Sequence, residues 1–93
     1  MGNKYTEHVL KLRSEFFEDV VYERKKFEVR KNDRDYKVGD KVIFREYGCW
    51  GYTGKEITRY ISYILTSEQF PDGLKEGYCV FGLTRIPGAV VLD

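Results

Sequence analysis

Six basic side chains fall within the eleven positions of residues 24–34, together with the two carboxylates Glu28 and Asp33. This segment therefore carries a net charge of +4, and because the whole chain sums to +1, the remaining residues sum to −3. A local positive patch on a mildly acidic protein indicates an anionic partner. The alternative is a solvated strand and turn whose lysines and arginines only keep the protein soluble. The side chains of this segment that we expect to contact a partner are Lys25, Glu28, Arg30, Lys31, Asn32 and Arg34.

From position 26 onward the residues alternate with a period of two, which is typical of a β-strand. Phe27 and Val29 then point to one side, and Glu28 and Arg30 point to the other. We expect Glu28, which is flanked by cations, to be ionised and to act only as a hydrogen-bond acceptor. A carboxylate in a basic cleft suits the exocyclic amine of a base, whereas Arg and Lys suit phosphates and base edges. The alternative is an internal network in which Glu28 pairs with Arg30 or Lys25.

A glycine-rich loop predicted over residues 48–54 carries the second set of candidate side chains. If they lie exposed beside a basic groove, Tyr47, Trp50 and Tyr52 would stack on unpaired bases, at about 1–3 kcal/mol for each base. Loop aromatics also fold back to cover the end of a barrel, and a chain of 93 residues needs that buried area. The single histidine, His8, lies on or near the first strand and is interpreted first as a structural residue and only second as a cleft residue.

One early helix and a series of short strands must position these side chains. The helix is expected over residues 14–21, with Ser14 as its N-cap, and it should end near residues 23–25. A strand begins near residue 27, and the others are expected over residues 9–12, 41–47, 57–65, 78–83 and 89–92. Short turns over residues 32–35 and 38–40 join them. This order predicts an α+β protein, a small mixed β-barrel of about six strands with one early helix.

Length and composition limit the chain to a single domain over residues 1–93. It is 42% hydrophobic and 33% charged, which is typical of a globular protein. No stretch approaches the roughly 18 apolar residues of a membrane-spanning helix. Cys49, Cys79 and His8 lack the spacing of a metal site, so we expect no metal and no other cofactor. We expect a cytoplasmic monomer in which Cys79 is a small buried hydrophobic residue.

Residues 23–30 resemble the Gly-x-Lys-x-x-Glu-x-Arg signature of the ASCH superfamily. Further matching segments, most specifically residues 30–36, extend the resemblance over residues 8–83 to a small bacterial and phage ASCH-like family. That family has no established function, and its members are often labelled RNA-binding. The resemblance implies a PUA-like β-barrel with a cleft lined by Lys25, Glu28 and Arg30. Glu23 stands where the signature has glycine, a residue that would permit a left-handed turn.

These features predict that the protein binds RNA or a nucleotide in a basic cleft. Some ASCH relatives instead hydrolyse the N4-acyl amide of a modified cytidine, and they carry a threonine where this chain has Glu28. A carboxylate that attacked an amide would form an anhydride, a difficult intermediate. An amidohydrolase is therefore the alternative, with Lys25 and Glu28 as its candidate catalytic residues. A phage-type protein-interaction module, with the aromatic loop as its hot spot, is a further alternative.

Overall fold

The structure, a computed structural model, describes residues 5–87. Its elements are, in chain order, β1 (Glu7–Arg13), α1 (Ser14–Val21), β2 (Phe27–Lys31), β3 (Lys41–Gly48), β4 (Gly51–Thr66) and β5 (Tyr78–Thr84). The strands form one five-stranded sheet in the order β1-β3-β4-β5-β2. β1 and β3 are parallel and the other three pairs are antiparallel, so the sheet is mixed, as predicted.

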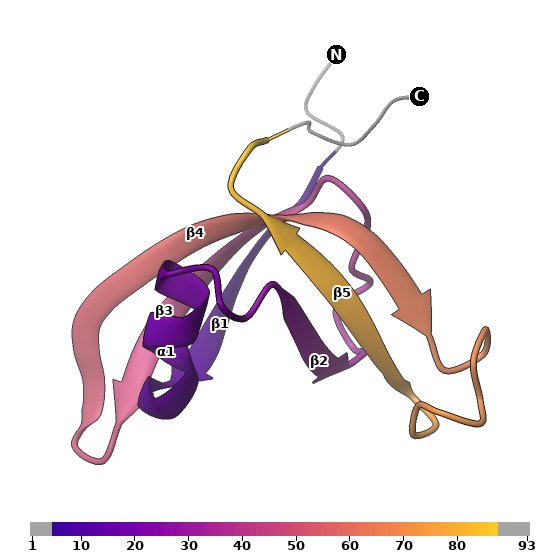
Figure 1. Ribbon diagram of the computed structural model, residues 1–93, viewed down its shortest axis with the longest axis horizontal. Coiled ribbons are helices and arrows are strands. Elements are labelled where there is room, and N and C mark those ends of the chain that lie inside the picture. Colours follow the sequence, from indigo (N-terminus) through magenta and orange to yellow (C-terminus); the bar gives the residue numbers. More distant parts are fainter. Residues whose placement is uncertain (1–4, 88–93) are drawn as a thin grey trace.

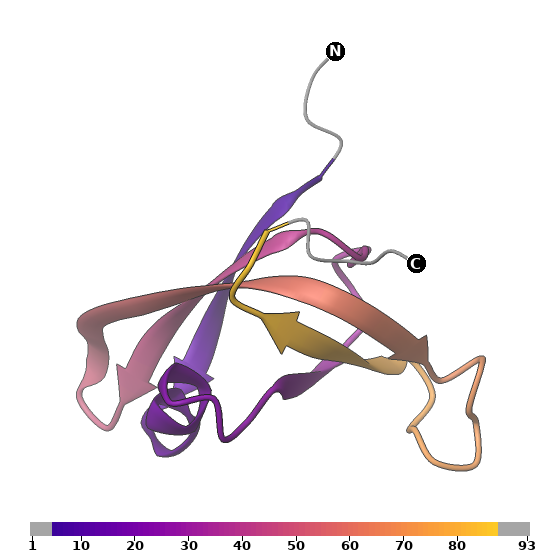
Figure 2. The ribbon, with the colours of Figure 1, turned by 45° about the horizontal axis from the view of Figure 1, so that its top comes forward.

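The sheet curls into half a barrel, and β4 spans the arch from its hairpin with β3 to the loop that precedes β5 (Figure 1 and Figure 2). Register shifts between Arg45 and Tyr47, and between Ile61 and Tyr63, mark the bulges of this bent sheet. Such bulges bend a strand and increase its twist. The curl leaves β1 and β2 as the two edge strands.

Arginine side chains link these two edges. Arg30 on β2 donates from Nη2 to the carbonyl oxygen of Lys11 on β1 at 2.6 Å. Arg34, which follows β2, donates from Nη1 to the carbonyl oxygen of Val9 at 3.3 Å. We call this junction the seam of the half-barrel. Guanidinium groups, and not a backbone ladder, connect its two sides.

The core lies between the sheet and α1, which contacts β1 and β3. Phe17 and Val20 form the buried face of the helix. The apolar spacing also predicts Phe16 and Val21 on this face, but Phe16 is 36% exposed and Val21 is only partly buried. Burying each side chain of this size contributes about 1.5–3 kcal/mol. The strands supply the rest of the core, which consists of Leu10, Leu12, Val42, Phe44, Ile61, Cys79, Phe81 and Leu83, with Tyr36 from the segment between β2 and β3.

The helix covers residues 14–21 as predicted. Its N-cap residue and the position of its end differ from the prediction. Arg13 occupies the N-cap position with φ −63° and ψ 145°, and no side chain caps the first turn, so the prediction of Ser14 as N-cap was wrong. The Ser14 hydroxyl instead lies against β3, where a Cβ on Gly48 would come within 3.0 Å of it. The helix ends at Val21, ahead of the predicted residues 23–25, because Glu23 adopts a φ of +63°.

The prediction of a loop over residues 48–54 was also wrong. β3 and β4 meet in a tight hairpin with Gly48 paired to Gly51, and only Cys49 and Trp50 lie between them. Gly51 adopts a φ of +102°, which other residues rarely adopt, so glycine makes this turn possible. The strand predicted over residues 57–65 therefore extends over Gly51–Thr66. The sixth predicted strand, over residues 89–92, lies outside the described residues.

Candidate functional site

A hollow of about 390 Å³ opens along the seam, between β1, the first turn of α1 and β2. We call it the seam cleft. Its lining carries four cationic side chains and one carboxylate, so the cleft is strongly positive. The lining residues are Lys11, Leu12, Arg13, Phe16, Glu28, Val29, Arg30, Lys31 and Tyr78.

Glu28 is the single carboxylate in the lining, and it pairs with two cations. Its side chain is only 7% exposed, and each of its oxygens accepts a hydrogen bond from a different cation. Lys25 Nζ donates to Oε1 at 2.5 Å, and Arg30 Nε donates to Oε2 at 2.6 Å. The internal network that the sequence left open is therefore formed. A carboxylate held in this way fixes the direction of the Arg30 guanidinium, which spans the seam.

The two sides of β2 are unusual for a strand, because the apolar side chains are exposed and a charged one is buried. Its alternation is as predicted, but Phe27 and Val29 are about half exposed, at 49% and 50%, while Glu28 is buried. Burying a charge and exposing apolar side chains costs stability. Local conflicts of this kind are expected where a strand serves a site and not the core.

Several donors in the cleft are free for a partner. Within residues 5–87, the Lys31 ammonium has no ion-pair or hydrogen-bond partner, and Arg30 uses only Nε and Nη2, which leaves Nη1. Lys11 places its Nζ 4.2 Å above the ring of Tyr47. Arg13 pairs with Glu15 at 3.2 Å, on an exposed surface where such pairs are weak.

The other predicted residues lie outside the cleft. The Asn32 backbone N–H donates to the Gly77 carbonyl, and its exposed side chain lines no part of the cleft. Arg34 donates a hydrogen bond to the carbonyl oxygen of Val9 at the seam. Lys25 reaches Glu28 from the segment between α1 and β2, and it also donates to the carbonyl oxygen of Phe27 at 2.9 Å.

The hairpin carries a separate aromatic cluster. Trp50 is 98% exposed at its tip, so it does not cover the core. Tyr47 and Tyr52 contact each other edge to face, with ring centroids 5.0 Å apart, and Arg45 lies 4.3 Å above the ring of Tyr52. The predicted candidates Trp50 and Tyr52 are thus not in the seam cleft itself.

Lys11 and Arg13 connect the two regions. Both line the seam cleft, and both also line a second hollow beside Tyr47 and Cys49 at the base of the hairpin. Sequence reasoning missed Lys11 and Arg13, although their alternation along β1 with the buried Leu10 and Leu12 placed them on the outer face. It also missed Phe16 and Tyr78, which contribute rings to the wall of the cleft.

Buried groups beneath the seam support it without lining it. Tyr36 packs between His8 and Phe81, with ring centroids 4.8 Å from each. Burial raises the pKa of the Tyr36 phenol, and the positive charges of Arg30 and Arg34 oppose this change. Burial also raises the pKa of the Cys79 thiol, which suits a packed side chain and not a nucleophile.

His8 is structural, as the sequence indicated. Its Nε2 lies 2.8 Å from Asp40 Oδ2, and both side chains are buried. Within residues 5–87, no group of three His, Cys, Asp or Glu side chains could hold a metal ion. No helix in the same range is long and apolar enough to cross a membrane.

The sequence matches a known family over most of its length. The chain belongs to the DUF3850 family, a domain of unknown function. The family profile matches residues 7–83, a range that contains the whole seam cleft. The chain is also 34% identical over 55 residues to an uncharacterized 12.9 kDa protein in the GpA 3′ region of Escherichia phage P2. That match covers 59% of this chain and 50% of the phage protein, so the chain spans about half the length of that relative.

Proposed function

We propose that the seam cleft binds single-stranded RNA or a nucleotide. The observation that carries this proposal is the continuity between cleft and hairpin, because Lys11 and Arg13 line both hollows. Cationic side chains thus run from Lys31 on β2 to Arg13 on β1, and the exposed ring of Trp50 lies at the hairpin tip. Binding a single strand requires this combination of cations that follow phosphates and rings that stack on bases.

Arg30 is the first phosphate contact in this proposal. Glu28 and the Lys11 carbonyl hold two of its nitrogens, at 2.6 Å each, so its free Nη1 points in a fixed direction. Fixing a side chain before binding removes the entropy cost of ordering it in the complex. Lys31, exposed one residue further along β2, provides a second cation without an internal partner among residues 5–87.

Trp50 is the ring best placed to stack on a base. Tyr47 and Tyr52 already carry Lys11 and Arg45 over their faces, at 4.2 and 4.3 Å, whereas 98% of Trp50 is exposed. Stacking on an exposed ring is tolerant of sequence, since every base has a π-face. We therefore expect little preference among unpaired bases at this position.

The relation to the ASCH superfamily is part of the same proposal. Two observations support it. Glu23 adopts a φ of +63° at the position of the signature glycine, the conformation that glycine would serve. Lys25 and Arg30 both donate directly to Glu28, as residues of one signature would. A further strand along the half-barrel would complete a PUA-like β-barrel.

The geometry gives less support to an amidohydrolase. A general base must accept a proton from water or substrate, but both oxygens of Glu28 already accept from Lys25 and Arg30. A protein-interaction role for the hairpin has the exposed Trp50 in its favour, and the experiment below separates it from RNA binding.

The test is a titration with single-stranded oligouridylate, followed by the fluorescence of Trp50, which is the single tryptophan of the chain. If three or four phosphates are neutralised, the logarithm of the association constant should fall against the logarithm of salt concentration with a slope of about −2 to −3. Arg30→Ala and Lys31→Ala should each flatten that slope by about 0.7, since each removes one phosphate contact.

Lys41→Ala is the matched control, because it removes one positive charge at the end of β3 that lies away from the hairpin. It should leave the slope unchanged. Trp50→Ala removes the fluorescent reporter, so its binding is followed by calorimetry, and it should be weaker by about 1–3 kcal/mol at unchanged stability. Absent binding, or equal losses from Lys41→Ala and Arg30→Ala, would contradict the proposal.

A further inference from the structure

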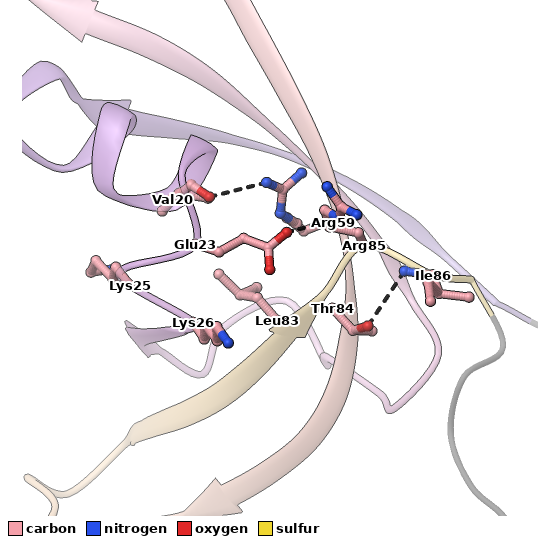
Figure 3. A pocket seen from close by; sticks show the side chains of 9 residues that line it. All are labelled: Val20, Glu23, Lys25, Lys26, Arg59, Leu83, Thr84, Arg85 and Ile86. Carbon is pink, nitrogen blue, oxygen red and sulfur yellow. Dashed lines mark hydrogen bonds and ion pairs between the residues drawn. The ribbon is translucent and has the colours of Figure 1, made fainter.

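A third hollow, of about 260 Å³ and also positive, lies beneath the C-terminal end of α1. Figure 3 shows it between the helix, the segment that leads to β2, and the residues at and after the end of β5. It shares no lining residue with the seam cleft. Its lining consists of Val20, Glu23, Lys25, Lys26, Arg59, Leu83, Thr84, Arg85 and Ile86.

The charges of this hollow do not balance. Lys25 directs its ammonium to Glu28 and to the Phe27 carbonyl, so it contributes no free charge here. Lys26, Arg59 and Arg85 remain, against the single carboxylate of Glu23. Within residues 5–87, the Lys26 ammonium has no hydrogen-bond or ion-pair partner.

Arg59 is the central cation of the hollow. The residue is only 7% exposed, yet no carboxylate of residues 5–87 lies within ion-pair distance of it. It donates from Nη2 to the carbonyl oxygens of Val20 and Val21, at 3.0 and 3.3 Å, and from Nη1 to that of Thr58 at 2.8 Å. These bonds cap the end of α1 and use the carbonyl groups that a helix leaves unpaired.

Two N–H donors of Arg59 are left over, the Nε–H and the second N–H of Nη1. The Nε–H makes no hydrogen bond among residues 5–87, its nitrogen is not fully buried, and Arg59 lines the hollow. Burial lowers the pKa of Arg59; Glu23 opposes this change and Arg85 adds to it. A buried cation without a full counter-charge is costly, and a bound anion would remove that cost.

Glu23 provides only part of the counter-charge. Its carboxylate lies 2.8 Å from Arg85 Nε and reaches toward both guanidinium groups (Figure 3). We propose that this hollow binds a phosphate group, held by Lys26, Arg59 and Arg85, and that Glu23 competes with it for the same cations. Thr84 adds a hydroxyl to the wall. Phosphate oxyanions suit this donor set because Arg and Lys both recognise them.

Size and wall chemistry limit the phosphate compound. A volume of about 260 Å³ lies below the roughly 300–1,000 Å³ of pockets that hold drug-sized ligands. Val20, Leu83 and Ile86 form an apolar side next to the cations. The hollow therefore fits inorganic phosphate or the phosphate group of a monoester such as a nucleoside monophosphate.

The test is calorimetric titration at constant ionic strength with inorganic phosphate, cytidine 5′-monophosphate and cytidine as separate probes. Phosphate should bind, and Lys26→Ala and Arg85→Ala should each weaken it about fivefold, the effect of one charge about 4 Å away in water. Glu23→Gln should strengthen it by a similar factor, because it removes the competing carboxylate. Arg59 is left unchanged, since it caps α1.

Arg30→Ala and Lys31→Ala are the controls, because both residues belong to the seam cleft and neither lines this hollow. They should leave phosphate affinity unchanged, which also separates this site from the proposed RNA site. Tighter binding of the monophosphate than of phosphate, with no binding of cytidine, would identify a monoester as the occupant, and equal affinities would identify free phosphate. Absence of phosphate binding even in Glu23→Gln, or binding lost in Arg30→Ala but kept in Lys26→Ala, would overturn the proposal.

Discussion

Two carboxylates are buried to a similar degree in this protein, but they are bound in different ways. Asp40 is 0% exposed and Glu28 is 5% exposed. Asp40 accepts from the backbone N–H groups of Thr6 and Lys37, at 3.0 Å each, and lies 2.8 Å from the buried His8. Glu28 accepts from two side-chain cations, Lys25 and Arg30.

The partners distinguish a structural carboxylate from a carboxylate that serves a site. Backbone N–H groups and a 5%-exposed histidine cannot turn toward a ligand, so Asp40 only fixes the turn before β3. Lys25 and Arg30 keep 18% and 24% of their side chains exposed, and Arg30 lines an open cleft. A buried carboxylate therefore indicates a binding site when the cations that hold it remain accessible.

The largest expected effect belongs to Asp40→Ala. The change leaves two backbone N–H groups and His8 without their acceptor in the core, and breaking a buried pair costs about 3–5 kcal/mol. Urea denaturation should show a loss of this size in the free energy of unfolding. RNA affinity per folded molecule should stay unchanged, because Asp40 does not line the cleft. A loss of stability below about 1 kcal/mol would break the comparison, since surface changes have effects of that order.

Glu28→Gln should have a smaller effect on stability and a larger effect on binding. The loss of unfolding free energy should be about 1–3 kcal/mol, because the released cations can turn to water. Arg30 contacts phosphate in the parent protein already, so the same release adds only Lys25 as a phosphate contact, and the salt slope for oligouridylate should steepen by about 0.7. An unchanged slope would show that Glu28 is structural in the same sense as Asp40.

The sequence predicted the local arrangement of the site well. The period-two pattern of residues 27–30 placed Glu28 and Arg30 on one face of a strand, and the structure joins them at 2.6 Å. The helix over residues 14–21 and the strand that became β5 were also visible, because each has a distinct apolar pattern. All of these features depend on residues only a few positions apart.

Contacts between distant segments could not be predicted in this way. Lys11 lines the cleft because the curled sheet brings β1 opposite β2, and no local pattern encodes that curl. Arg59 lies among β-branched and aromatic residues, where it would be taken for a solvent-facing cation. Two of its three carbonyl partners lie 38 and 39 residues away on α1. The hairpin was missed because the glycines of residues 48–54 were interpreted as a loop, whereas Gly51 makes the tight turn.

A third carboxylate, Glu23, extends the comparison to the exposed surface. Its side chain is 37% exposed and its partner Arg85 is 67% exposed, so their ion pair should contribute only about 0–1 kcal/mol. The backbone has the greater effect on stability at this position, since a left-handed φ of +63° costs a residue with a Cβ about 1–2 kcal/mol. Glycine avoids that cost, but it also loses more conformational freedom on folding.

Two substitutions at Glu23 separate the ion pair from the backbone strain. Both Glu23→Ala and Glu23→Gly remove the ion pair, but only glycine relieves the backbone. Glu23→Ala should therefore lower the free energy of unfolding by no more than about 1 kcal/mol. Glu23→Gly should exceed Glu23→Ala by about 1 kcal/mol, and so match or surpass the parent protein, in urea denaturation at neutral pH. Equal stabilities of the two variants would mean that the left-handed backbone is unstrained here, and the match to the signature glycine would lose its physical basis. We expect substitutions at Glu23 to change the free energy of unfolding less than those at Asp40 or Glu28, because burial decreases along the series from Asp40 through Glu28 to Glu23.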